Sequence, residues 1–120
     1  MPSFDEHLSK ARKNQEFAAS LRLDTPTCVG WALTALFYSA LHYVEAYNAK
    51  YHHHCDNHKQ RNDEIVRNDV LVPIWADYSD LANFSWNARY RPKSYGVEDF
   101  NEAQQYQANI ARRVTELIAN

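Results

Sequence analysis

Three polar residues in one apolar stretch are the first candidates for chemistry. Tyr38, His42 and Glu45 are four and three residues apart, so a helix places them on one face. A histidine beside a carboxylate can exchange protons near neutral pH. Alternatively, the three side chains are polar groups of a core or an interface that satisfy one another, as most polar residues inside helical bundles do.

A second pair, His58 and Arg61, also shares one face of a predicted helix. An imidazole can move a proton, and a guanidinium can hold a phosphate through two parallel hydrogen bonds. Cleavage of an RNA backbone needs this combination. The alternative is an exposed helix start, in which Arg61 forms a surface ion pair with Glu64.

The segment between these two groups is rich in histidine. His53, Cys55 and His58 offer the nitrogen and sulfur ligands that suit zinc. No second pair of ligands at a standard spacing occurs elsewhere in the sequence. A solvent-facing loop is therefore the favoured interpretation, zinc binding is the alternative, and we expect no cofactor.

A fourth candidate combines cations and aromatic rings without any acidic residue. Arg89, Arg91 and Lys93 lie close in sequence to Trp86 and Tyr90. Aromatic faces stack on bases and cations neutralise phosphates, so this is the best local patch for nucleic acid. The alternative is a helix end whose cations satisfy terminal carbonyls while the aromatic rings pack.

Composition limits the class of protein. The chain has 120 residues, of which 45% are hydrophobic and 13% aromatic, enough for the core of one domain spanning residues 1–120. A net charge of −2 excludes a global positive field, so binding to nucleic acid requires a local patch. No Walker-type glycine-rich loop, Gly-x-Ser-x-Gly elbow or His-Glu-x-x-His motif is present. Kinase, simple hydrolase and metalloprotease functions are therefore unsupported.

The two cysteines and the longest apolar run indicate in which compartment of the cell the protein is expected. Cys28 and Cys55 lie in different segments and no signal peptide precedes them, so we expect reduced thiols in a cytoplasmic protein. The longest apolar run, from Trp31 to Val44, is too short and too polar to span a bilayer.

Apolar periodicity predicts an all-α fold with short connections, which favours an up-and-down antiparallel bundle of four to five helices. The run around Trp31 is apolar on almost all sides and is expected at the centre of the bundle. The expected helices span about 3–23, 26–50, 58–68, 73–90 and 97–119.

Two of these stretches, with the closing helix, resemble a known family. Trp31–His42 is similar to an apolar "FYxALH" helix, and Ser85–Pro92 to an "S-x-x-A-R-Y-x-P" helix ending. Both patterns, with Glu102-Ala103 and the apolar stripe of the last helix, resemble the HEPN superfamily (higher eukaryote and prokaryote nucleotide-binding domains). The resemblance covers nearly the whole chain, on degenerate motifs.

The resemblance implies a helical bundle, often dimeric, that acts on nucleic acid or nucleotides in defence, toxin–antitoxin or RNA-processing settings. Many such domains are metal-independent ribonucleases with an Arg-x(4–6)-His motif that is completed across a dimer. This motif is absent here, because no arginine is followed by a histidine at that spacing. His58-x-x-Arg61 supplies the same side chains in reverse order.

We therefore expect a HEPN-like, homodimeric domain that binds RNA or a nucleotide. For RNA cleavage, Arg61 would hold the scissile phosphate and His58 would transfer the proton, supported by Tyr38, His42 and Glu45. The alternative is a non-catalytic, antitoxin-like or accessory module that binds another protein.

Overall fold

A computed structural model describes residues 2–119; Met1 and Asn120, the ends of the predicted domain, lie outside the described residues. The described chain contains α-helices and no strand, which confirms the all-α prediction. Its elements are α1 (Phe4–Ser20), α2 (Pro26–Lys50), α3 (His58–Arg67), the 3₁₀ turn η1 (Val72–Ile74), α4 (Trp75–Tyr90) and α5 (Val97–Ile118). None of the helices within residues 2–119 combines the length and the apolar character needed to cross a membrane.

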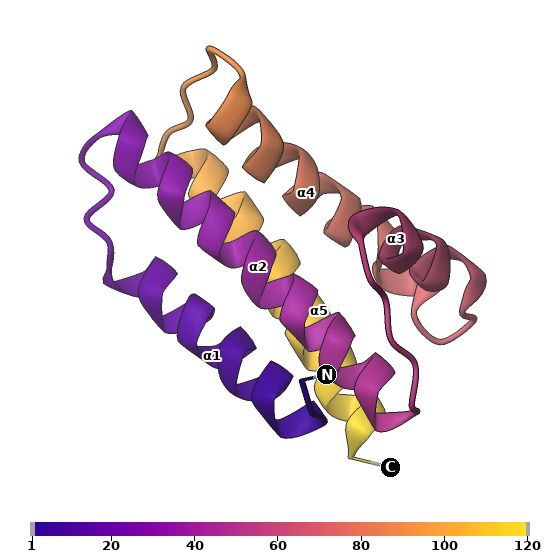
Figure 1. Ribbon diagram of the computed structural model, residues 1–120. Coiled ribbons are helices and arrows are strands. Elements are labelled where there is room, and N and C mark those ends of the chain that lie inside the picture. The colour runs from indigo at the N-terminus through magenta and orange to yellow at the C-terminus, as the bar shows by residue number, and fades with distance from the viewer. Residues whose placement is uncertain (1, 120) are drawn as a thin grey trace.

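The four long helices run alternately in opposite directions around α2 (Figure 1). α1 packs against α2, whereas α4 and α5 pack against α2 and against each other. α3 and η1 belong to the connection between α2 and α4 and lie at one end of the bundle (Figure 1). The predicted antiparallel bundle is confirmed, with α2 as its central helix.

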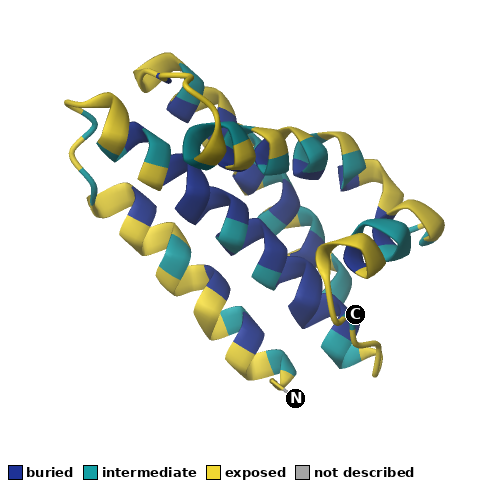
Figure 2. Cartoon of the chain, turned by 45° about the horizontal axis from the view of Figure 1, so that its top comes forward, coloured by how far each residue is buried: buried dark blue, intermediate teal, exposed yellow. Residues whose placement is uncertain are grey.

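The burial of α2 follows from its composition. Between Val29 and Asn48, every residue is buried except Gly30, Trp31, Tyr38 and His42. Figure 2 shows this as an almost continuous buried band along α2, in contrast to the mixed faces of α1. An apolar helix of this kind is stable only when other helices cover it on several sides.

The expectation that Trp31 lies in the core was wrong, because its side chain is 56% exposed. Trp31 precedes Tyr38 by two helical turns and shares its stripe of α2, and His42 continues that stripe one turn later. This stripe is the part of α2 that its neighbours cover least. Aromatic and polar side chains on it can therefore reach a ligand.

Side-chain caps set the start of three helices. Ser3 and Glu6 form a capping box at the start of α1, and the Thr25 hydroxyl accepts a hydrogen bond from the Cys28 backbone N–H of α2. At α3, the Asn57 side chain is the cap and accepts a hydrogen bond from the Gln60 backbone N–H. The cap fixes where α3 begins, and so it places His58 at the first position of that helix.

Replacing Leu33 by alanine should lower the free energy of unfolding by about 3 kcal/mol, because the lost side chain leaves a cavity in a close-packed core. Leu33 is completely buried in α2. Urea denaturation followed by circular dichroism measures the change. Phe17→Ala is the control, since Phe17 is 52% exposed and should cost little. A Leu33→Ala protein as stable as the wild type would contradict the central position of α2.

Candidate functional site

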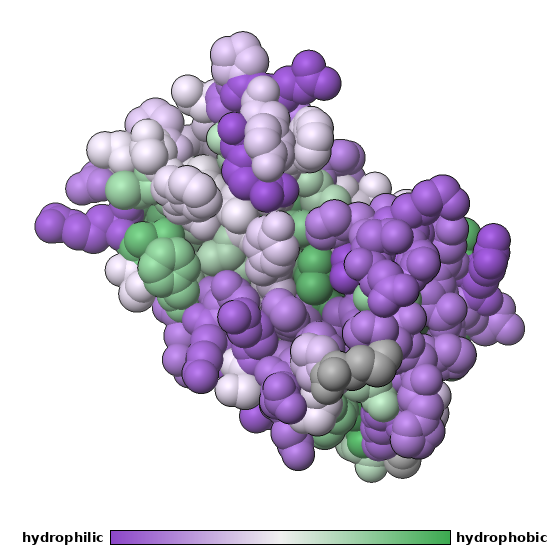
Figure 3. All heavy atoms as spheres, in the orientation of Figure 1, coloured by the Kyte–Doolittle hydropathy of each residue, from purple (hydrophilic) through white to green (hydrophobic). Residues whose placement is uncertain are grey.

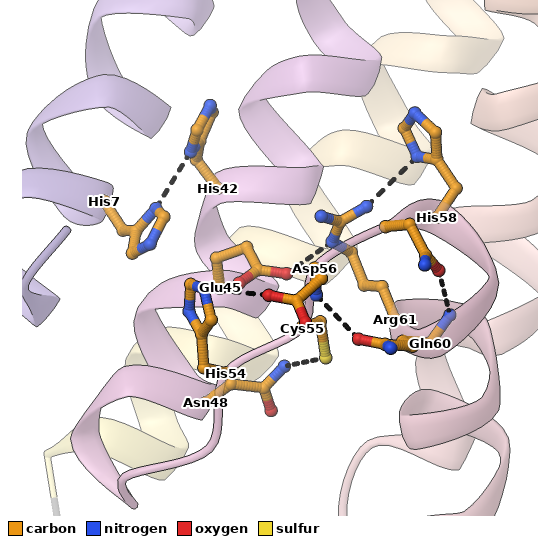
Figure 4. A network of polar contacts seen from close by, with 11 residues as sticks. His7, His42, Glu45, Asn48, His54, Cys55, Asp56, His58, Gln60 and Arg61 are labelled. Carbon is orange, nitrogen blue, oxygen red and sulfur yellow. Dashed lines mark hydrogen bonds and ion pairs between the residues drawn. The ribbon is translucent and has the colours of Figure 1, made fainter. Parts of the chain in front are cut away.

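The three polar residues of α2 do not form one catalytic cluster, because each contacts a different helix. His42 contacts His7 of α1, and Glu45 forms an ion pair with Arg61 of α3 (Figure 4). The Tyr38 hydroxyl accepts a hydrogen bond from Arg89 of α4 at 3.4 Å. α2 therefore uses these side chains to hold α1, α3 and α4 in place.

Arg61 is a buried residue, with 8% of its surface exposed. Its Nε donates to Glu45, which is also buried, and not to Glu64 as the surface alternative expected. A guanidinium and a carboxylate removed from water stabilise each other only as a pair. The pair fixes α3 on α2, and it directs the Arg61 side chain towards Glu45 rather than towards solvent.

His58 accepts a hydrogen bond from Arg61, with 3.1 Å between its Nδ1 and the Arg61 Nη1. Because a guanidinium can only donate, Nδ1 is the acceptor and the proton of a neutral His58 is on Nε2. Partial burial, followed by the charges of Arg61 and Arg89, lowers the pKa of His58. His58 in this arrangement offers a ligand an Nε2–H donor, and its basic nitrogen is already occupied.

A histidine pair joins α1 to α2, with 3.1 Å between the Nδ1 atoms of His7 and His42 (Figure 4). One ring must donate the hydrogen bond and the other must accept it through an unprotonated nitrogen. At most one of the two rings can therefore be positively charged while the contact is present. Burial and the neighbouring His7 lower the pKa of His42 to about 4. Sequence reasoning missed His7, although its spacing of four residues to the buried Ala11 was a signal for the inward face of α1.

Two side chains of the histidine-rich loop, Cys55 and His54, make contacts within the fold. Among residues 2–119, no group of three or more His, Cys, Asp or Glu side chains is arranged to hold a metal ion, and this includes His53, Cys55 and His58. Cys55 instead receives a hydrogen bond from Asn48 at 3.8 Å, and His54 lies 3.5 Å from Asp56. Burial raises the pKa of the Cys55 thiol, which keeps it protonated.

Arg89 lies between two hollows on the side of α4 that faces α2. The first hollow, of about 360 Å³, is formed by the start of α2 and the end of α4. The second, of about 290 Å³, is formed by α2, α3 and α4. Pro26, Thr27, Gly30, Trp31, Ala88, Arg89 and Tyr90 line the first hollow, and Phe37, His58, Asn62, Ala82, Asn83, Trp86 and Arg89 line the second.

Contacts within the fold hold Arg89 in its place. Its Nε donates to the Ser85 carbonyl at 3.2 Å, and its guanidinium lies 5.0 Å from the centre of the Tyr90 ring and 5.8 Å from that of Tyr38. No carboxylate among the described residues forms an ion pair with Arg89, Arg91 or Lys93. These cations remain available to an anion.

The aromatic rings around Arg89 are exposed. Trp86 and Tyr90 are 51% and 60% exposed, and their ring centres lie 4.5 Å apart on successive turns of α4. Figure 3 shows that less hydrophilic residues gather over the end of α4 and the start of α2, while the surface over α3 is strongly hydrophilic. We call Trp31, Trp86, Arg89, Tyr90, Arg91 and Lys93 the Arg89 surface.

Comparisons of the chain with protein-family models, curated proteins and solved structures gave no significant match.

Replacing Arg61 by methionine should lower the free energy of unfolding by about 3–5 kcal/mol, because Glu45 is then buried without its partner. Arg67→Met is the matched control, since Arg67 is an exposed residue of the same helix. The double variant Glu45→Leu/Arg61→Met should recover much of the loss. Chemical denaturation measures all three, and an Arg61→Met protein as stable as Arg67→Met would refute a structural role for the pair.

The stability of the protein should fall as the pH drops from 6.5 to about 4. In this range the unfolded chain binds a proton at His42 that the folded chain does not, so protonation favours unfolding. His42→Phe should show a smaller slope of unfolding free energy against pH, whereas exposed His53→Phe should keep the wild-type slope. Equal slopes in the wild type and His42→Phe would count against the part-buried contact between His7 and His42.

Proposed function

We propose that this chain binds single-stranded RNA or a nucleotide at the Arg89 surface. The observation that carries the proposal is the position of Arg89, which has no ion pair within residues 2–119 and lies between two hollows bordered by exposed aromatic rings. Three features of the Arg89 surface fit RNA or a nucleotide as the ligand.

The first feature is charge. Arg89, Arg91 and Lys93 can neutralise phosphates through charge-assisted hydrogen bonds, and a guanidinium can do so with two bonds at once. The described residues that line the two hollows include no carboxylate to repel an anion. A local cationic patch of this kind compensates for a net charge of −2.

The second feature is the exposure of Trp31, Trp86 and Tyr90. Large aromatic rings are usually buried, and in this arrangement their faces are open to a planar ligand. Bases stack on such rings with little regard to sequence. The combination of stacking surfaces and unpaired cations is typical of proteins that bind single strands.

The third feature is the state of His58, which favours binding over cleavage. A neutral His58 whose Nδ1 accepts a hydrogen bond from Arg61 can donate Nε2–H to a phosphate, but it has no free lone pair with which to act as a base. Together with the absent Arg-x(4–6)-His motif, this supports a HEPN-like domain that is a binder. We place the phosphate contact at Arg89 instead of Arg61, since Arg61 is buried against Glu45.

A second candidate function is binding of another protein, either a partner chain or a second copy in a homodimer. The exposed rings of Trp31, Trp86 and Tyr90 favour it, because aromatic residues are enriched in protein interfaces. The two functions differ in their response to salt, since phosphate contacts weaken steeply with ionic strength and apolar contacts do not. Either function suits a protein of the cytoplasm.

Arg89→Ala should weaken binding to a single-stranded RNA oligonucleotide by about ten- to a hundredfold, because charge-assisted hydrogen bonds are lost. It should also reduce the slope of log affinity against log salt by about one. Fluorescence anisotropy at several salt concentrations measures both. Arg112→Ala is the matched control, since Arg112 is an exposed cation of α5 outside the Arg89 surface.

The same oligonucleotide should stay intact when it is incubated with the protein in EDTA. Cleavage that persists in EDTA and is lost in His58→Ala would instead assign a metal-independent ribonuclease to this site. Binding that does not respond to salt or to Arg89→Ala would favour the protein-interaction alternative.

A further inference from the structure

We infer that the Arg89 surface holds two consecutive nucleotides, one base in each hollow with their phosphodiester at Arg89, and that the second hollow reads its base through the amides of Asn62 and Asn83. This inference rests on the proposed function and deepens it. It is built from the different chemistry of the two hollows and from the residue that they share.

The shared residue is Arg89, which lines both hollows. Its Nε and Nη1 are used by Ser85 and Tyr38, while its Nη2 makes no hydrogen bond to any described residue. A phosphate bound there would have one hollow on either side. In a single strand, the bases on either side of a phosphodiester are consecutive, so one strand can fill both hollows at once.

The first hollow offers stacking with little hydrogen-bonding specificity. Trp31 and Tyr90 supply its aromatic walls, and Gly30 and Ala88, which have little or no side chain, form its floor. A Cβ added at Gly30 would lie 3.5 Å from the Ala88 Cβ, which is an ordinary contact. The polar groups of this hollow are Arg89, the Thr27 hydroxyl, the Tyr90 hydroxyl and the Trp31 indole N–H. Among the described residues it has no side-chain amide or carboxylate, so we expect any base to fit.

The second hollow can distinguish one base from another. Its aromatic walls are Phe37 and Trp86, and the amides of Asn62 and Asn83 reach it from α3 and α4. Neither amide makes a hydrogen bond to another described residue, unlike Asn87, which donates to Tyr95. An amide offers a donor beside an acceptor, so it can make a bidentate contact with a base edge that presents the complementary pair. His58 adds an Nε2–H donor for the phosphate.

The wall between the hollows also fits a strand that passes from one to the other. Trp86 lines the second hollow and Tyr90 the first, and the two rings are neighbours on one face of α4. Two bases separated by these rings can each stack on one of them. The footprint is therefore two nucleotides, and the exposed Arg91 and Lys93 follow Tyr90 in the chain.

The test is a titration of the whole protein with mononucleotides and dinucleotides, followed by quenching of tryptophan fluorescence. AMP, ApA, CpC, GpG and UpU are the probes. ApA should bind about tenfold or more tightly than AMP, because a second base stacks. The four homodinucleotides should also differ in affinity, because each base presents a different edge to the two amides, and ApU and UpA then show which position is read.

Two pairs of variants separate the hollows. Gly30→Leu fills the first hollow and should reduce the affinity for ApA to that for AMP, while Gly30→Ala is the control that leaves most of the space. Trp31→Ala tests the same hollow without adding bulk. Asn83→Ala should reduce the differences in affinity among the four homodinucleotides, and Asn109→Ala on α5 is its control. Circular dichroism confirms that each variant is folded.

The outcomes distinguish the inference from the proposed function. Dinucleotides that bind no more tightly than AMP, or a base preference that survives Asn83→Ala, would overturn the inference. If a longer oligonucleotide still binds through Arg89 in that case, the proposed function stands. No binding of any RNA or nucleotide by the folded wild type would overturn both.

Discussion

The burial of α2 on nearly all sides is the constraint on which the rest of this structure depends. A buried polar side chain on a helix in that position needs a partner, because an unsatisfied buried polar group is costly. The neighbouring helices supply several of these partners, although the buried Oδ1 of Asn48 makes no hydrogen bond to a described residue. His7 of α1 contacts His42, Arg61 of α3 contacts Glu45, and α5 contributes Gln107, which donates to Ser39 of α2 at 3.1 Å.

Residues of the same type have different roles in this structure, because their contacts differ. Arg61 and Arg89 are both arginines beside α2, yet the first is buried against a carboxylate and the second lies beside aromatic rings and open space. Only the second has charge to offer a ligand. The Glu45–Arg61 pair still contributes indirectly, because it places α3 and so brings His58 and Asn62 to the second hollow.

The Arg89 surface lies where the neighbouring helices leave part of α2 uncovered. The stripe that carries Trp31 and Tyr38 faces the end of α4, and Arg89 bridges from that helix to the Tyr38 hydroxyl. Gly30 and Ala88 let the two helices approach, with 3.5 Å between the Ala88 Cβ and a Cβ built at Gly30. Close packing at small residues, next to large exposed rings, produces the hollows.

The sequence by itself determined the helices, their order and the central place of α2, because periodicity, caps and turn residues act over a few neighbouring positions. It also singled out Arg89, Trp86 and Tyr90 as a local patch. Only the tertiary structure decided the partners of Glu45 and His42 and the exposure of Trp31. Those outcomes depend on which helix covers each side of α2, and residues as distant in sequence as His7 and His42 carry no local record of their contact.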